Sequence, residues 1–141
     1  MSKALEKVLY TATATATGGR EGRVLSDDGT VDLALVPPPG LGGKGGGANP
    51  EQLFAAGYSA CFGSAVAHIA RLQKIHTGAV KVTAKVSIGP VGKTFGLAVE
   101  LVVDLPELPR EQAEVLIAAA HEVCPYSNAT RGNIDVVVRL A

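Results

Sequence analysis

The sequence predicts an α+β domain in which antiparallel sheets pack on a long central helix and a second helix. Alternation of apolar and polar residues, with the period of a strand, occurs on both sides of the middle of the chain. Between these blocks the stretch from Leu53 to Ala67 carries no charge and is apolar or small on every side, as in a buried helix. With 141 residues, 47% of them hydrophobic, residues 1–141 have the size of one domain with its own core.

The first fifty residues read as a small antiparallel meander followed by a loop. Residues 8–17 predict a strand, because tyrosine or alanine alternates with threonine from Tyr10 onwards, and Gly18-Gly19 then turns the chain. Residues 23–26 and 31–36 are the next predicted strands, joined by the hairpin signal Asp27-Asp28-Gly29. The proline- and glycine-rich residues 37–47 predict a long loop.

The central helix has a well-marked start. Asn49 suits the capping position, Pro50 the first helical position, and Gln52 can complete a capping box. The helix is expected to run to about Lys74, where polar residues gather. A small domain covers all faces of such a helix most easily by pairing with a second copy, so we expect a homodimer.

The second half of the chain predicts two strands, a helix and a last strand. Residues 80–88 alternate, and residues 94–103 end in the continuous apolar run typical of a central strand. A second helix is expected over residues 109–122, and Cys124 should lie just beyond it because Pro125 disfavours the helical conformation in the residue before it. Residues 134–140 form the last predicted strand. The buried side of the second helix is predicted from spacings of three and four: Ala113, Leu116, Ile117 and Ala120.

Composition argues against several kinds of partner. Thirteen basic and thirteen acidic residues cancel, and only 4% of residues are aromatic, so nucleic acid is not an expected partner. The first seven residues lack the apolar core of a signal peptide, and the apolar helix is interrupted by Gly, Ser and His, so we expect no membrane span and a cytoplasmic location. The glycine-rich loop lacks the strand and helix of a dinucleotide site, and the three histidines lack ligand-like spacing, so neither cofactor nor metal is expected.

The two cysteines, Cys61 and Cys124, are either inert core residues or a redox pair. Burial in apolar surroundings raises a thiol pKa, so a reactive Cys61 needs a nearby cation to hold its thiolate, and Arg20 and Arg23 are the candidates. Cys124 is predicted at a helix end, where backbone freedom suits a resolving thiol.

Glu51 is the carboxylate at the start of the central helix, where a negative charge is favoured by roughly 0.3–1 kcal/mol. Ten residues at about 1.5 Å each separate it from Cys61 by some 15 Å along the helix, too far for contact. A shared site therefore needs either Arg20 as a bridge or the partner subunit's Glu51. The sequence leaves both arrangements open.

Three blocks of this sequence resemble the organic hydroperoxide resistance proteins of the OsmC-like superfamily: residues 10–20, 49–62 and 124–133. The resemblance implies a thiol-dependent peroxidase folded as an intertwined α+β homodimer. It matches Cys61 to the peroxidatic cysteine and Cys124 to the resolving cysteine. It also matches Arg20 to the arginine that polarises the thiolate, and Glu51 to the carboxylate that orients that arginine. The implied reductant is a dithiol, carried by a lipoylated protein.

The expected reaction reduces an organic hydroperoxide to an alcohol through a Cys61 sulfenic acid and a Cys61–Cys124 disulfide. Alternatives are a non-catalytic dimer that binds apolar molecules, with the cysteines as a redox sensor, and a Cys/His hydrolase, for which His68 lies roughly 10 Å away along the helix. An apolar pocket would favour alkyl or fatty-acid hydroperoxides over hydrogen peroxide. Four side chains of the central helix are predicted to line it: Leu53, Phe54, Tyr58 and Phe62.

Overall fold

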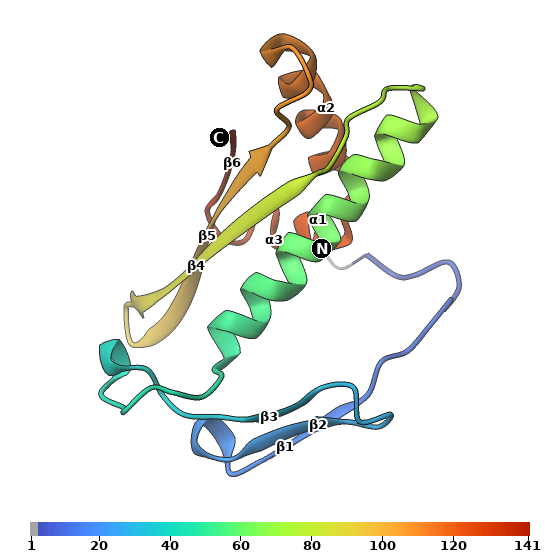
Figure 1. The fold of residues 1–141 in the computed structure, drawn as a ribbon. Helices are drawn as coiled ribbons and strands as arrows, with labels where there is room; N and C mark the ends of the chain where they lie inside the picture. Colours follow the sequence, from blue (N-terminus) through green and yellow to red (C-terminus); the bar gives the residue numbers. More distant parts are fainter. Residues whose placement is uncertain (1–2) are drawn as a thin grey trace. The chain divides into compact units, whose positions relative to one another are not determined.

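The computed structural model describes residues 3–141, which divide into two compact units, up to Pro50 and from Glu51 onwards (Figure 1). The single domain expected over residues 1–141 stays a prediction. The first unit holds three strands, and the second holds three helices and three strands. This is the predicted α+β class.

The first unit is the predicted antiparallel meander, β1 (Ala14–Thr17), β2 (Arg23–Ser26) and β3 (Asp32–Ala34), in that order. β1 is shorter than the predicted residues 8–17, because β2 offers only four partners and its register with β1 ends at Ser26. β3 is likewise shorter than residues 31–36. Pairing length, rather than the alternation of the sequence, sets both strands.

The turn after β1 confirms the role of its glycines. Gly18 and Gly19 have φ of 82° and 58°, in the left-handed region that favours glycine. The short 3₁₀ helix η1 (Gly19–Glu21) follows, and a second one, η2 (Pro39–Leu41), lies in the predicted loop. A Cβ on Gly22 would lie 1.5 Å from the carbonyl oxygen of Thr17, so this corner needs a glycine.

In the second unit, helix α1 (Pro50–Leu72) begins at the predicted residue and ends two residues before Lys74. Lys74 itself has φ of 57°, which no longer continues a helix. By length and composition alone α1 is long and apolar enough to cross a bilayer, although the sequence predicts no membrane span, since Glu51 and Arg71 are its only Asp, Glu, Lys or Arg residues. Its buried side nevertheless packs into a protein core: Tyr58, Phe62, Ala65, Val66, Ile69 and Ala70.

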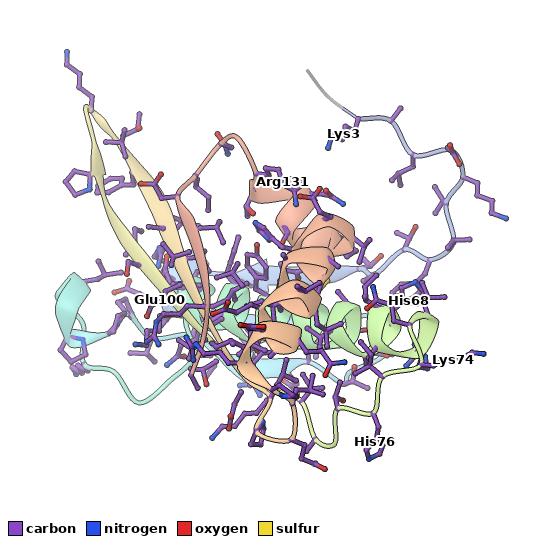
Figure 2. All side chains as sticks on the ribbon, turned by 90° about the horizontal axis from the view of Figure 1, so that it is seen from above. Lys3, His68, Lys74, His76, Glu100 and Arg131 are labelled. Carbon is purple, nitrogen blue, oxygen red and sulfur yellow. The ribbon has the colours of Figure 1, made fainter. Side chains whose placement is uncertain are left out.

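Within a single chain α1 is buried on one side, and the all-round burial expected of it depends on the predicted second copy. A stripe with a spacing of four residues stays exposed along the helix: Gln52, Ala56, Ala60, Ser64 and His68. His68 and Lys74 mark the C-terminal end of this helix in Figure 2. Within the described chain, α1 therefore has one covered side and one uncovered side.

The second sheet has the order β4 (Lys81–Val91), β5 (Thr94–Asp104) and β6 (Val136–Leu140), so β5 is the central strand, as predicted. β4 and β5 pair antiparallel, but β6 pairs parallel to β5, which the prediction of antiparallel sheets missed. The two helices between β5 and β6 provide the long crossover that a parallel pair requires.

The faces of this sheet differ in polarity, as the alternation predicts. The outer face carries ion pairs from Glu100, labelled in Figure 2, to Lys85 at 3.1 Å and to Arg139 at 3.3 Å. The register places nine apolar residues together on the other face: Val82, Ala84, Val86, Val99, Leu101, Val103, Val136, Val138 and Leu140. This apolar face belongs to the same core as α1.

Helix α2 (Arg110–Val123) buries the four residues predicted from their spacing. A third helix, α3 (Pro125–Thr130), was not predicted. It is six residues long, too short to show periodicity, and Pro125 at its first position ends one helix and starts the next. Cys124 is the single residue between α2 and α3, and it is part of the core.

Candidate functional site

The two thiols lie next to each other. Cys61 of α1 and Cys124 are both free, and their sulfur atoms are 3.7 Å apart. A disulfide has an S–S length of about 2.05 Å, so the atoms must approach by about 1.65 Å to bond. The structure therefore brings together two residues that are 63 positions apart in sequence. Only a small movement of their sulfur atoms is needed to form a disulfide.

The surroundings of Cys124 differ from those expected of a mobile thiol. Its side chain is 0% exposed, held between the end of α2 and the start of α3, whereas Cys61 is half-buried. Cys124 already lies beside its partner, so a large excursion is not needed to reach it. The accessible thiol is Cys61.

The local environment holds the Cys61 thiol in its neutral form. Burial raises the pKa of Cys61 above its ordinary value, a backbone N–H of Tyr126 lowers it in part, and the neighbouring Cys124 thiol raises it further. These neighbours alone do not make a thiolate, so a reactive Cys61 needs positive charge from elsewhere.

The predicted charged partners lie in different units. Arg20 is half-buried in η1 of the first unit, and Glu51 is half-buried in the first turn of α1. Arg23, the other candidate cation, pairs with Asp32 across β2 and β3 at 2.6 Å. The roles expected of Arg20 and Glu51 stay predictions.

An aromatic cluster lies where α1 meets α3. The rings of Phe54, Tyr58 and Tyr126 have centroids between 5.6 and 6.3 Å apart. Tyr126 is 38% exposed, and a Cβ on Gly57 would lie 2.5 Å from its hydroxyl oxygen, so the glycine leaves room for this ring against α1. Sequence reasoning missed Tyr126, although it lies two residues after Cys124.

The four residues predicted to line a pocket fall into two pairs. Leu53 and Phe54 are half-buried near the start of α1, whereas Tyr58 and Phe62 are 0% exposed and belong to the core. A groove of about 450 Å³ lies elsewhere, between α2 and β6, and neither thiol lines it. The substrate pocket stays a prediction.

Buried polar groups next to the thiols were also missed. The hydroxyl of Tyr58 lies 2.8 Å from Ser127 Oγ and 3.2 Å from Thr130 Oγ1, and Ser127 Oγ lies 2.7 Å from His121 Nδ1. Burial and the nearby Arg131 lower the pKa of His121, so the neutral imidazole is favoured. Within residues 3–141 no group of three or more His, Cys, Asp or Glu side chains is arranged to hold a metal ion.

Comparison with known proteins settles the family. Residues 43–139 match the OsmC-like protein family. This chain belongs to that family. An organic hydroperoxide resistance protein of Xanthomonas axonopodis pv. citri is 54% identical over 138 residues, which cover 96% of this chain and 97% of that protein. The organic hydroperoxide resistance protein OhrB of Bacillus subtilis is 48% identical, covering 94% of this chain and 98% of that protein.

A solved structure agrees with this family membership. The crystal structure of an organic hydroperoxide resistance protein from Legionella pneumophila superposes with a TM-score of 0.92 at 51% identity, over 96% of this chain and 99% of that chain. This OsmC-like chain therefore falls in the organic hydroperoxide resistance branch of the family.

Proposed function

We propose that this OsmC-like protein is a thiol-dependent peroxidase that reduces organic hydroperoxides to alcohols. The observation that carries the proposal is the pair of free thiols 3.7 Å apart, one accessible and one buried. Relatives that match nearly the whole chain are named for organic hydroperoxide resistance, which supports the substrate class.

The proposed reaction has two covalent steps. The Cys61 thiolate attacks the outer oxygen of the hydroperoxide, an S–O bond forms as the O–O bond breaks, and the departing alkoxide takes a proton to become the alcohol. The Cys124 sulfur then attacks the resulting Cys61 sulfenic acid, and the hydroxyl leaves as water with the Cys124 proton. Two electrons from an external dithiol restore both thiols.

Arg20 is the proposed cation that stabilises the thiolate. Burial and the Cys124 thiol raise the pKa of Cys61, so a stable thiolate needs a cation beside it, and Arg23 already pairs with Asp32. A guanidinium can hold a thiolate and a carboxylate at once and keeps its charge at any physiological pH. Glu51, from the same subunit or from a partner, is the proposed carboxylate that orients Arg20.

The proposed substrates are alkyl and fatty-acid hydroperoxides. Leu53 and Phe54 supply partly exposed apolar surface at the start of α1, and Tyr58 and Phe62 form the core behind them. An apolar site gains from burying an alkyl chain and offers little to hydrogen peroxide, which has none.

A homodimer is proposed because α1 leaves one side uncovered in the described chain, the side that carries Ala56 and Ala60. Covering this surface with a second copy would remove apolar area from water. The proposed reductant is a dithiol carried by a lipoylated protein, and the proposed location is the cytoplasm. No nucleic acid or membrane takes part in the proposed reaction.

The test compares consumption of a fatty-acid hydroperoxide and of hydrogen peroxide, with dihydrolipoamide as reductant. We expect fast turnover of the first, slow turnover of the second, and none of either in Cys61→Ser. Ser59→Ala is a matched control, because its hydroxyl bonds only to the Ala56 carbonyl of its own helix. No hydroperoxide turnover, together with apolar-ligand affinity that Cys61→Ser retains, would instead indicate a binding protein.

A further inference from the structure

A buried chain of hydroxyl groups joins the three helices around the thiols. Ser127 Oγ lies within hydrogen-bond distance of both Tyr58 on α1 and His121 on α2, at 2.8 and 2.7 Å. Tyr58 and Ser127 are both 0% exposed. Polar groups buried this deeply need their partners, because an unsatisfied one is costly, so the chain fixes the distances between the helices.

Helix α3 depends on these contacts for its position. With six residues it is far below the length at which a helix is stable alone. Its buried side consists of Ser127 and Thr130, and both contact the Tyr58 hydroxyl. On the outer side Arg131, labelled in Figure 2, donates to the carbonyl oxygen of His121 and to Asn128 Oδ1.

The segment positioned in this way carries both groups that act on Cys61. Cys124 immediately precedes α3, with its sulfur 3.7 Å from that of Cys61. Tyr126 is the second residue of α3, and its backbone N–H is the described group that opposes the burial of the Cys61 thiol. A shift of α3 would therefore change the reactivity of Cys61 and the approach of Cys124 together.

We infer that Ser127 is a positioning residue of the thiol reaction, whose hydroxyl, held by Tyr58 and His121, fixes α3 so that Cys124 and the Tyr126 N–H both face Cys61. This inference rests on the proposed peroxidase function. Ser127 touches neither the hydroperoxide nor the sulfur atoms in this role. It sets the rate at which the sulfenic acid on Cys61 forms the S–S bond to Cys124 with loss of water.

The test uses Ser127→Ala and Tyr58→Phe, which remove one hydroxyl each from the two ends of the same hydrogen bond. Each purified protein is treated with one equivalent and then with excess fatty-acid hydroperoxide. Mass spectrometry measures the share of Cys61 found as disulfide and as sulfinic acid. A second readout is the pH dependence of Cys61 alkylation, which a purely structural role would not move. Ser59→Ala, next to Tyr58 on α1, is the matched control.

We expect disulfide closure to slow by about threefold to tenfold in both variants, the effect of one buried hydrogen bond. More sulfinic acid should form at excess hydroperoxide, and Cys61 alkylation should require a higher pH. The double variant should lose less than the sum of the two single ones, since both remove the hydrogen bond between Tyr58 and Ser127. Ser59→Ala should match the wild type in both readouts.

The inference would be overturned if folded Tyr58→Phe gave the wild-type shares of disulfide and sulfinic acid and the wild-type pH dependence of Cys61 alkylation, even if Ser127→Ala fails to fold. That result leaves the peroxidase proposal intact, because the wild-type protein would still consume hydroperoxide. A wild-type protein that neither consumes hydroperoxide nor forms the Cys61–Cys124 disulfide would overturn the proposed function and this inference with it.

Discussion

Replacing Cys124 by serine tests the second thiol at the geometry seen in the structure. The sulfurs need to approach by only about 1.65 Å to bond, since they are 3.7 Å apart and a disulfide is about 2.05 Å long. A thiol held this close acts at an effective concentration far above that of a thiol in solution. We therefore expect the Cys61 sulfenic acid to live at least about a hundredfold longer in Cys124→Ser.

The assay for this prediction is a single turnover with one equivalent of fatty-acid hydroperoxide. The first equivalent of alcohol should form in Cys124→Ser as in the wild type, and dimedone should then label Cys61. Excess hydroperoxide should carry the variant on to the sulfinic acid.

Folding is the control for this variant. A serine hydroxyl at this fully buried position costs about 1–3 kcal/mol, within the roughly 5–15 kcal/mol stability of a typical domain. Cys124→Ala removes the thiol without adding a hydroxyl and should show the same chemistry. A folded Cys124→Ser protein that resists overoxidation as well as the wild type would refute the assignment of Cys124 as the resolving thiol.

Three further predictions concern stability and assembly. Burial lowers the pKa of His121 below its unfolded value of 6.5, so its contribution to stability should be fully present above pH 6.5 and be lost as the pH falls further. Urea titrations should therefore give a lower free energy of unfolding at pH 5.5 than at pH 7.5, and His121→Gln should reduce this difference. Gly57→Ala should displace the Tyr126 ring yet change the free energy of unfolding by less than about 1 kcal/mol, because the gain in helix propensity offsets the lost ring contacts. A larger loss of stability, measured by thermal unfolding, would show that the ring cannot move. Ala60→Glu on the exposed stripe should convert a dimer to a monomer in light scattering, whereas Ala118→Glu on the exposed side of α2 should not; equal behaviour of the two variants would count against this interface.

Local signals in the sequence predicted the two longer helices, α1 and α2, and the central strand well. The spacing of Ala113, Leu116, Ile117 and Ala120 identified the buried side of α2, and Pro50 identified the start of α1. These features depend on residues within one or two turns of each other, so a single sequence contains them. Helix α3 was missed because its six residues are too few to show the helical period of buried residues.

Features set by distant partners could not be predicted in the same way. The length of β1 follows from where β2 ends, and the parallel pairing of β6 follows from the path of the chain through α2 and α3. The hydroxyl chain joins Tyr58 to Ser127, 69 residues further on, and nothing local marks either residue. The sequence offered Cys61 and Cys124 as a possible redox pair, and the structure brings their sulfur atoms to 3.7 Å, whereas the depth at which Cys124 is buried emerged only from the structure.

The most direct test of the proposed peroxidase is to add one equivalent of fatty-acid hydroperoxide to the fully reduced protein, then to quantify the alcohol and the cysteine products together. The proposal predicts one alcohol per chain, loss of both free thiols, and a single Cys61–Cys124 disulfide by peptide mass spectrometry. Unconsumed hydroperoxide with both thiols still free would contradict it.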